Sequence, residues 1–309
     1  MKYIKITILS FFCFLPFLSF AQINVSEPQD SAYSFDGNAL LQYIKTLSSD
    51  TFEGRRTGTK GAEKTQNYII HQFDSLNVLP LGKHYKQSFT FTEKRQAYQG
   101  INILGYIKGA EFPEKYIVLS AHYDHEGVKD GDTYNGADDN ASGTSALFSF
   151  AEYFKNHPPK HSVILAAFDA EELGLQGAKY FVENPIIPLE DVIVNFNMDM
   201  ISRNDKNELF AVGARFNNAL QQIVLNTPTP KNIKLRTGHD GADGQENWTY
   251  SSDHAAFHRK NIPFLYFGVE DHEDYHQPTD DYENIQPQFY INAVKTIISV
   301  FKQVDTLSL

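Results

Sequence analysis

The chain has 309 residues, a formal net charge of −11 and one cysteine. This length can bury one large core or two smaller ones, and the acidic balance argues against nucleic acid or an anionic membrane surface as a partner. The single cysteine, Cys13, lies in a stretch that we expect to be removed from the mature chain. The mature protein would then have no disulfide and no thiolate ligand, so any metal must be held by nitrogen and oxygen donors.

The N-terminus is typical of an export signal. Lys2 and Lys5 form a basic start, an apolar run follows over residues 6–20, and Ser19 and Ala21 are small residues at the expected cleavage positions. The run is shorter than the ~20 residues of a spanning helix, so we expect no membrane anchor once the signal is cleaved. We predict a periplasmic or extracellular protein whose formal charge falls from −11 to −13, because the leader carries two lysines and no acidic residue.

The rest of the chain is expected to form one domain. No internal repeat, low-complexity tract or proline-rich linker occurs from Asp36 to Leu309. The predicted boundaries are a signal peptide at 1–21, a flexible N-terminal segment at 22–33 and a single folded domain at 34–309. The sequence does not indicate the oligomeric state.

Apolar periodicity divides this domain into alternating helices and strands. Helices are predicted at 38–47, 62–76, 142–156, 177–183, 217–225, 253–260 and 288–307. Strands are predicted at 87–92, 99–107, 116–121, 162–168, 192–198, 233–236 and 263–269, the first two as a hairpin. Continuous apolar strands between helices favour an α/β fold, a three-layer α/β/α domain with a mostly parallel mixed central sheet. Ligands in such folds bind beyond the carboxyl ends of the strands.

Short motifs of acidic residues and histidines follow one another along the domain. They are His122-Tyr123-Asp124, the stretch 135–143, Glu171-Glu172, Asn197-Met198-Asp199-Met200 and Asp274-Tyr275-His276. Three of them come at the end of an apolar run that is expected to be a buried strand. Burying carboxylates and imidazoles there costs several kcal/mol unless they are paired. A shared divalent metal is the simplest explanation.

His122 and Asp124 stand two residues apart, so on an extended segment both side chains project to the same side. A histidine bound to a metal usually donates its other N–H to a carboxylate, and Asp124 is placed to accept it. The alternative is a solvated pair in a loop. His125, the next residue, is interpreted as a bystander.

Asp138 and Asp139 open a predicted helix between small residues, which leaves room for an ion, although aspartates also cap helices without one. Glu171 and Glu172 directly follow a strand, and neighbours at a strand end cannot share one role. One can bind metal while the other serves as general base beside a metal-activated water. Two glutamates in the first turn of a helix are the alternative.

Asp199 lies between two methionines at the end of the most apolar strand, and His276 lies in a polar turn where His272 competes with it as a ligand. Imidazole and carboxylate donors without sulfur suit zinc, and manganese or cobalt less well. Two histidines and three carboxylates exceed the protein ligands of one tetrahedral zinc. They suit two zinc ions that share a bridging carboxylate.

The order and wording of these motifs resemble the co-catalytic di-zinc aminopeptidase family, which includes secreted bacterial leucyl aminopeptidases, with glutamate carboxypeptidases and glutaminyl cyclases as relatives. The resemblance runs from about Leu40 to Ile285. It includes the loop Glu53-Gly54-Arg55-Arg56-Thr57-Gly58-Thr59 and the tripeptide Ser252-Asp253-His254. The family's fold and function are therefore expected here, with 34–309 as a zinc peptidase catalytic domain.

The resemblance implies a role for each candidate residue. Asp139 would bridge two zinc ions, with His122 and Asp199 on one and Glu172 and His276 on the other. Glu171 would be the general base, and Asp124 the partner of His122. A cis peptide between Asp139 and Asn140 is also implied. Ser252-Asp253-His254 would line the pocket for the substrate N-terminus, unless Ser252 is a plain helix cap. Tyr250 is the nearest candidate for an oxyanion tyrosine, but its register is shifted, so it is not included in the catalytic set.

The expected reaction is hydrolysis of the amide bond at the free N-terminus of peptide substrates. A glutaminyl cyclase that uses one zinc is the closest alternative, although the run from Glu171 to Gly177 is more similar to the peptidases. A carboxypeptidase or dipeptidase of the same family would need a basic pocket, for which Arg203, Arg215 or Arg236 are candidates. An exported binding protein with a degenerate site is the alternative outside enzymes.

Overall fold

The computed structural model describes residues 35–307. The predicted signal peptide (1–21) and flexible segment (22–33) lie outside the described residues. Within residues 35–307, no helix has both the length and the apolar character that a membrane crossing requires.

The described part of the chain alternates between helices and strands as the sequence predicts. The helices are α1 (Gly37–Leu47), α2 (Lys60–Ser75), α3 (Gly143–Asn156), α4 (Gln176–Glu183), α5 (Asn218–Asn226), α6 (His254–His258) and α7 (Pro287–Val304). The strands are β1 (Leu79–Pro80), β2 (Lys86–Glu93), β3 (Gln96–Ile107), β4 (Phe112–His122), β5 (Gly127–Lys129), β6 (Asp132–Tyr134), β7 (His161–Phe168), β8 (Val192–Met198), β9 (Glu208–Val212), β10 (Lys234–Arg236) and β11 (Phe264–Gly268).

Nine of these strands form one sheet in the order β1-β3-β7-β4-β8-β11-β9-β10, with β2 paired to β3. The four central strands, β7, β4, β8 and β11, are parallel to one another. Antiparallel pairs flank them, β3 against β7 on one side and β9 against β11 on the other. The predicted mixed sheet is confirmed, and its parallel centre brings the carboxyl ends of β4, β7 and β8 to one edge.

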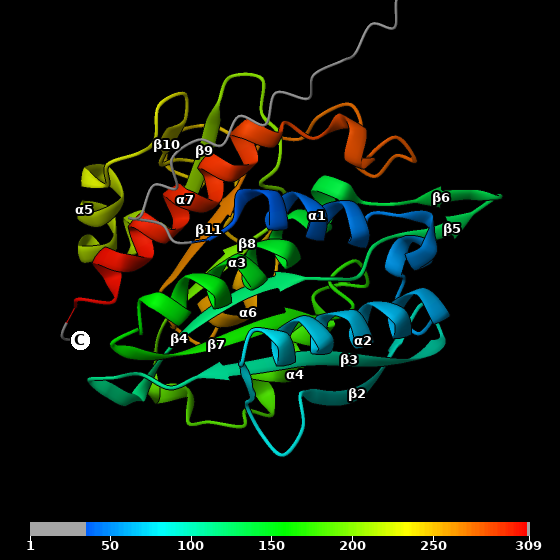
Figure 1. Cartoon of the computed structure of the whole chain (residues 1–309), viewed down its shortest axis with the longest axis horizontal. Coiled ribbons are helices and arrows are strands. Elements are labelled where there is room, and N and C mark those ends of the chain that lie inside the picture. Colours follow the sequence, from blue (N-terminus) through cyan, green and yellow to red (C-terminus); the bar gives the residue numbers. More distant parts are fainter. Residues whose placement is uncertain (1–34, 308–309) are drawn as a thin grey trace, which may run out of the picture. The chain divides into compact units, whose positions relative to one another are not determined.

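Helices cover both faces of this sheet (Figure 1). On one face, α1, α2, α3 and α7 bury a core that includes Leu119, Leu165 and Phe196 of the central strands. On the other face, α4 and α6 pack on Val118, Ile164 and their neighbours. Every residue of β7 is buried because the strand has helices on both sides, as expected of a continuous apolar run. The three-layer α/β/α prediction is confirmed.

Short and marginal elements were not predicted. The strand β9 follows a polar turn and has only five residues, so its apolar run is too brief to stand out. The hairpin β5–β6 is mostly polar and exposed, and it pairs only with itself. The predicted helix 253–260 shortens to α6, since residues 259–261 turn back toward β11.

Candidate metal centre

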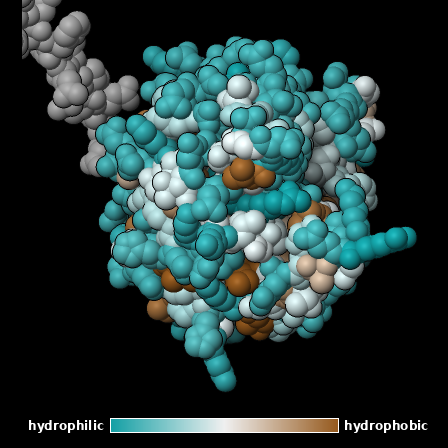
Figure 2. All heavy atoms as spheres, turned by 90° about the vertical axis from the view of Figure 1, so that its right-hand side faces the viewer, coloured by the Kyte–Doolittle hydropathy of each residue, from teal (hydrophilic) through white to brown (hydrophobic). Residues whose placement is uncertain are grey.

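The candidate ligands gather at the carboxyl edge of the parallel strands. His122 is the last residue of β4, Asp199 follows β8, and the glutamate pair lies a few residues beyond β7. Because β4 lies between β7 and β8, these strand ends are neighbours. Figure 2 views this side of the molecule, which is hydrophilic over most of its surface with small hydrophobic spots near the centre.

One group of donors surrounds the end of β4. The Nε2 atom of His122 lies 3.3 Å from Oδ1 of Asp139 and 3.3 Å from Oδ1 of Asp199. All three side chains are buried, and their donor atoms lie close enough together to share one ion. These are the three residues that the resemblance assigns to one zinc ion, and the structure brings their side chains together.

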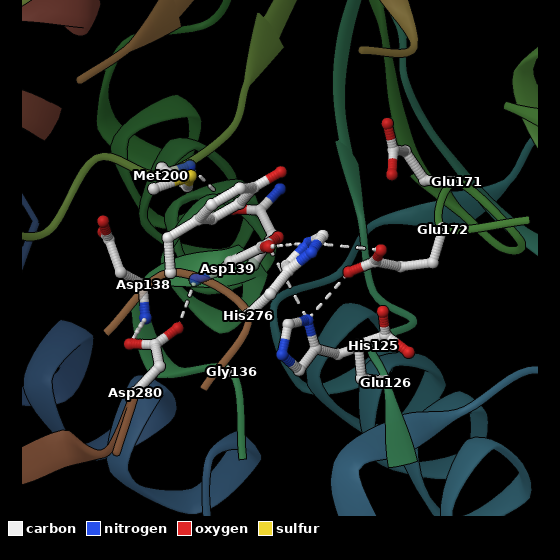
Figure 3. A network of polar contacts seen from close by, with 12 residues as sticks. His125, Glu126, Gly136, Asp138, Asp139, Glu171, Glu172, Met200, His276 and Asp280 are labelled. Atoms are coloured by element: carbon white, nitrogen blue, oxygen red, sulfur yellow. Dashed lines mark hydrogen bonds and ion pairs between the residues drawn. The ribbon is translucent and has the colours of Figure 1, made fainter. Parts of the chain in front are cut away.

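A second group shares the same aspartate (Figure 3). The Nε2 atom of His276 lies 3.1 Å from Oδ2 of Asp139 and 3.4 Å from Oε2 of Glu172. Asp139 therefore directs one oxygen toward each group. That is the geometry expected of a carboxylate that bridges two ions.

His125 is closer to the site than a bystander would be. Its side chain is fully buried, and its Nδ1 atom lies 2.9 Å from Oε1 of Glu172 and 3.7 Å from Oδ2 of Asp139. Nδ1 thus has Glu172 as an ion-pair partner, whereas Nε2 has no hydrogen-bond partner among the described residues. His125, Asp139 and Glu172 form a further group able to hold a metal. The sequence indicates this only by placing His125 directly after the His122-Tyr123-Asp124 motif, so the motif extends by one residue.

Asp139 is fixed through its backbone. The carboxylate of Asp280 accepts hydrogen bonds from the amides of Asp138 and Asp139 at 2.9 and 3.0 Å. The Asp138 carboxylate accepts from Ser202, and its other oxygen lies 3.0 Å from Nε2 of His272. His272 thus supports the aspartate loop, which leaves His276 as the candidate ligand. The peptide between Asp139 and Asn140 is cis, as the resemblance implies.

Asp124 is arranged differently from its expected role. The ring Nδ1 of His122 is 3.0 Å from the backbone oxygen of Asp124 but 3.7 Å from its carboxylate. The carboxylate instead accepts hydrogen bonds from the amides of Glu171 and Glu172 at 3.0 and 3.3 Å. These hydrogen bonds hold the carboxylate beside the glutamate pair that follows β7. Asp124 therefore orients both His122 and the glutamate pair.

In the absence of metal, the negative charge of the carboxylates in the site is balanced by the positive charge of protonated imidazoles. Burial raises the pKa of Asp139, but His125, His122 and His276 outweigh it and hold that pKa well below its usual range. Burial lowers the pKa of His276, yet hydrogen bonds to Asp139 and Glu172 raise it to about 10. The same donors take up a cation in place of protons, since metal binding displaces protons from its ligands. A set of buried nitrogen and oxygen donors without lysine or arginine fits zinc.

A cavity of about 110 Å³ opens beside the first group. Glu171 lines it together with His122, Asp139 and Asp199, whereas Glu172 does not. Burial raises the pKa of the Glu171 carboxyl well above its usual range, and the nearby Glu172 carboxylate adds to the rise while His122 opposes it. Met200, Tyr275 and His276, which belong to the predicted motifs, also line it. The lining residues that the motifs did not predict are Glu246, Trp248, Ser251, Tyr266, Val269 and Asp271.

The tripeptide Ser252-Asp253-His254 lies behind the cavity wall. Ser251 lines the cavity, but none of the three does. Ser252 accepts a hydrogen bond from Asn197, and the residue that precedes α6 is Asp253, without a capping hydrogen bond. Neither the pocket-lining nor the Ser-cap interpretation describes this segment. Tyr250 is 52% exposed and also lies outside the cavity lining.

The three candidate arginines are each paired with an acidic residue that is not part of the cavity lining. Arg203 pairs with Asp274, Arg215 with Asp240 and Arg236 with Glu208. No lysine or arginine is among the residues that line the cavity in the described part of the chain. The cavity is therefore acidic and aromatic.

Comparison with known proteins confirms the resemblance. The model of "Peptidase family M28" matches residues 102–301. Aminopeptidase YwaD of Bacillus subtilis is 31% identical over 197 residues, which cover 60% of this chain and 41% of the relative. A probable glutamate carboxypeptidase, VP8, of Zea mays is 35% identical over 118 residues, or 36% of this chain and 16% of the relative. The chain thus spans less than half the length of these curated relatives.

Solved structures share the fold over most of the chain. A zinc aminopeptidase from Bacillus subtilis superposes with a TM-score of 0.71 at 16% identity, covering 88% of this chain and 96% of that one. A Bacteroides thetaiotaomicron glutaminyl cyclase reaches the same TM-score of 0.71 at 19% identity, covering 87% and 98%. At such low identity the likeness establishes the architecture alone, and it does not separate a peptidase from a cyclase.

Proposed function

This chain belongs to peptidase family M28, and within that family we propose that it is an exported zinc-dependent exopeptidase that removes the N-terminal residue from peptides. The observation that carries the proposal is the pair of donor groups that share Asp139 beside a cavity lined by Glu171. A single structural zinc needs neither a shared carboxylate nor an adjacent cavity.

Two zinc ions would be held by this chain. His122, Asp139 and Asp199 would bind one, and Asp139, Glu172 and His276 would bind the other. Zinc bound there would supply Lewis-acid activation of water and of the substrate carbonyl. His125 lies within reach of the second group and extends its donor set.

Glu171 would move the proton. Its side chain lines the cavity, and its amide is held by the carboxylate of Asp124 at 3.0 Å. A carboxylate in this position accepts a proton from the attacking water and returns it to the leaving amine. Burial favours the protonated form of Glu171, which suits the return step.

The cavity is suited to the N-terminal end of a peptide. Glu246 and Asp271 line it in addition to the candidate ligands and base, so the local charge attracts an ammonium group and repels a C-terminal carboxylate. Among the described residues no lysine or arginine lines it, and Arg203, Arg215 and Arg236 pair with acidic residues that are not part of the lining. These contacts favour an aminopeptidase over a carboxypeptidase.

The cavity also limits what can enter. Its volume of about 110 Å³ is below the ~150 Å³ of an engineered cavity that holds one benzene molecule. There is room for one side chain of moderate size, so only a terminal residue would fit. Met200, Trp248 and Val269 are the apolar residues in an otherwise mostly polar lining, and an uncharged side chain of the substrate would pack against them.

Hydrolysis of aminoacyl p-nitroanilides by the purified chain tests this function. The panel would be measured with and without chelator, with the zinc content determined on the same sample, and a peptide with N-terminal glutamine would be included. We expect chelator-sensitive cleavage, about two zinc ions per chain and a preference for apolar N-terminal residues.

The other outcomes separate the alternatives. Release of ammonia from N-terminal glutamine with one zinc per chain would identify a glutaminyl cyclase. Two zinc ions without cleavage of the panel would point to a carboxypeptidase or dipeptidase. No zinc and no turnover would leave an exported binding protein. Export itself would be tested by N-terminal sequencing of protein recovered from the periplasm or medium, with Gln22 expected as the first residue.

A further inference from the structure

The loop before α2 reaches into the metal centre from outside the region that the family model matches. That region is 102–301, whereas the loop consists of residues 53–58. We call Gly54–Thr57 the tether segment. It lies between the end of α1 and the start of α2, and it contacts the segments that carry the candidate ligands. None of the roles described above uses it.

Arg55 is the central residue of the tether segment. Its side chain is only 1% exposed, and its guanidinium has no acidic partner within ion-pair distance among the described residues. It donates hydrogen bonds to four backbone oxygens instead. The acceptors are Leu47 at 2.9 Å, Tyr123 at 2.8 Å, Asn135 at 2.5 Å and Gly136 at 2.8 Å.

Leu47 is the last residue of α1, and the other three acceptors belong to the two segments that must meet in the centre. Tyr123 directly follows His122, and Gly136 precedes Asp139 by three residues. One guanidinium therefore joins the end of β4 to the loop of the bridging aspartate. Its planar fork of five N–H donors can make these bonds at once, which a lysine ammonium cannot do in the same plane.

Thr57 connects the tether segment to the base. Its hydroxyl donates its one proton to Oδ1 of Asp169 at 2.8 Å, and the same oxygen packs against Oδ2 of Asp124 at 3.5 Å. Asp124 in turn holds the amide of Glu171. The contact reaches Glu171 through Asp124, so it is weaker in its effect than that of Arg55.

The backbone of this loop is shaped to hold these positions. Glu53, Gly54 and Arg55 all have left-handed φ values, 52°, 61° and 55°, which non-glycine residues rarely adopt. A side chain at Gly54 would clash with the backbone oxygens of Gly127 and Tyr134 in the β5–β6 hairpin. The loop is therefore packed tightly between this hairpin and the strand ends.

We propose that the tether segment positions the metal centre, with Arg55 fixing the segments of His122 and Asp139 and Thr57 supporting Glu171 through Asp124. This inference rests on the proposed function and deepens it. It makes Arg55 and Thr57 positioning residues, which act through the ligands and the base and do not touch the substrate.

The test is the zinc affinity of the purified full chain, measured by competition with a chelating dye. Arg55→Lys keeps the charge but loses the fork, and we expect about 10–100-fold weaker zinc binding, the usual cost of removing a group that orients ligands. Arg236→Lys, at the remote strand β10, controls for loss of a guanidinium. Leu220→Ala removes a buried side chain of α5 and controls for general destabilisation of the fold. Both controls are expected to retain the wild-type affinity.

Thr57→Val is a second variant, and it leaves the buried guanidinium of Arg55 in place. We expect a lower kcat at saturating zinc, an unchanged KM and little change in zinc affinity. Wild-type affinity in Arg55→Lys, or an equal loss in Leu220→Ala, would overturn the inference. If Arg55→Lys does not fold, an unchanged kcat in Thr57→Val overturns it and a reduced one supports it. Absence of zinc binding by the wild-type chain would reject the proposed function as well.

Discussion

The two halves of the metal centre are built from different parts of the fold. His122 and Asp199, the strand-end half, lie at the ends of β4 and β8, and their side chains are 1% and 10% exposed. Glu172 and His276, the loop half, lie in connections between elements, and their side chains are 8% and 34% exposed. Asp139 belongs to both. If two zinc ions bind as proposed, the sheet would fix the candidate ligands of one ion, and loops would arrange those of the other, among which His276 is the most exposed.

This division has consequences for affinity. Ligands on strands lose little freedom when they bind an ion, since packing already holds them. Ligands on loops lose more, because few buried contacts hold them. We therefore expect the strand-end half to bind zinc more tightly, and the loop half to be the one that empties first when zinc is removed.

Changing the shared residue should produce the largest effect. Asp139→Asn removes a charge from both halves at once, so we expect zinc content to fall from about two ions to less than one and activity to drop by more than about 100-fold, beyond the cost of losing a supporting residue. Asp132→Asn, in the exposed strand β6, is the control. Retention of one tightly bound zinc in Asp139→Asn would show that the aspartate serves only one half.

The neighbouring glutamates should separate chemistry from metal binding. Glu171→Gln is expected to lower kcat by about 10²–10⁴-fold, the range for losing a general base, while both zinc ions stay bound. Glu172→Gln is expected to lose the loop-half zinc and to lower activity through that loss. Steady-state kinetics and the zinc content of the two variants distinguish a general base from a metal ligand. Near-normal turnover in Glu171→Gln would remove it from the catalytic role.

Replacing one histidine from each half should lower the unfolding free energy by different amounts. In zinc-free protein, His122→Ala leaves buried carboxylates without their partner, and we expect a loss of about 1–3 kcal/mol in unfolding free energy. His276→Ala affects a side chain that is 34% exposed, and we expect less than about 1 kcal/mol. Urea unfolding after chelation measures both. Equal losses would contradict the division into a rigid and a loop-borne half.

The same division explains what the sequence could predict. The strand-end ligands were identifiable because His122 and Asp199 interrupt apolar runs, where a charge needs a partner. The sheet and its helices were likewise predictable from periodicity, apart from short elements such as β9. The cavity residues Trp248 and Tyr266 were not, because they reach the site from separate loops and strands and carry no local pattern.

The roles of His125, Arg55 and Asp280 were hidden for a related reason. Each acts through contacts with residues more than 40 positions away or across a turn, such as the bonds from Arg55 to Tyr123 and from the amide of Asp139 to Asp280. A sequence shows that these residues are polar. Only the fold shows that they are buried and what they contact.

The last prediction concerns a buried carboxyl group near the strand-end half, whose replacement should raise stability at high pH only. Asp253 is fully buried, and neither of its carboxyl oxygens has a hydrogen-bond partner among the described residues. Burial raises the pKa of Asp253 to about 8, with Asp124 and Asp199 adding to the rise and His122 opposing it. The folded state therefore keeps a proton that the unfolded chain releases above its ordinary pKa of 3.8. Because the folded state binds more protons across this window, unfolding free energy should fall as pH rises from about 4 to about 8.

Asp253→Asn removes this proton and should make zinc-free protein more stable than wild type at pH 8, by about 1–3 kcal/mol, with little gain near pH 4. Urea unfolding of chelated protein at both pH values measures the difference. Asp240→Asn is the matched control, since that buried carboxylate already pairs with Arg215 and its replacement should bring no gain. A gain of equal size at both pH values would mean that packing, and not the buried charge, limits stability behind the strand-end half. A gain confined to high pH would show that ionisation of the buried Asp253 carboxyl lowers the stability of this half.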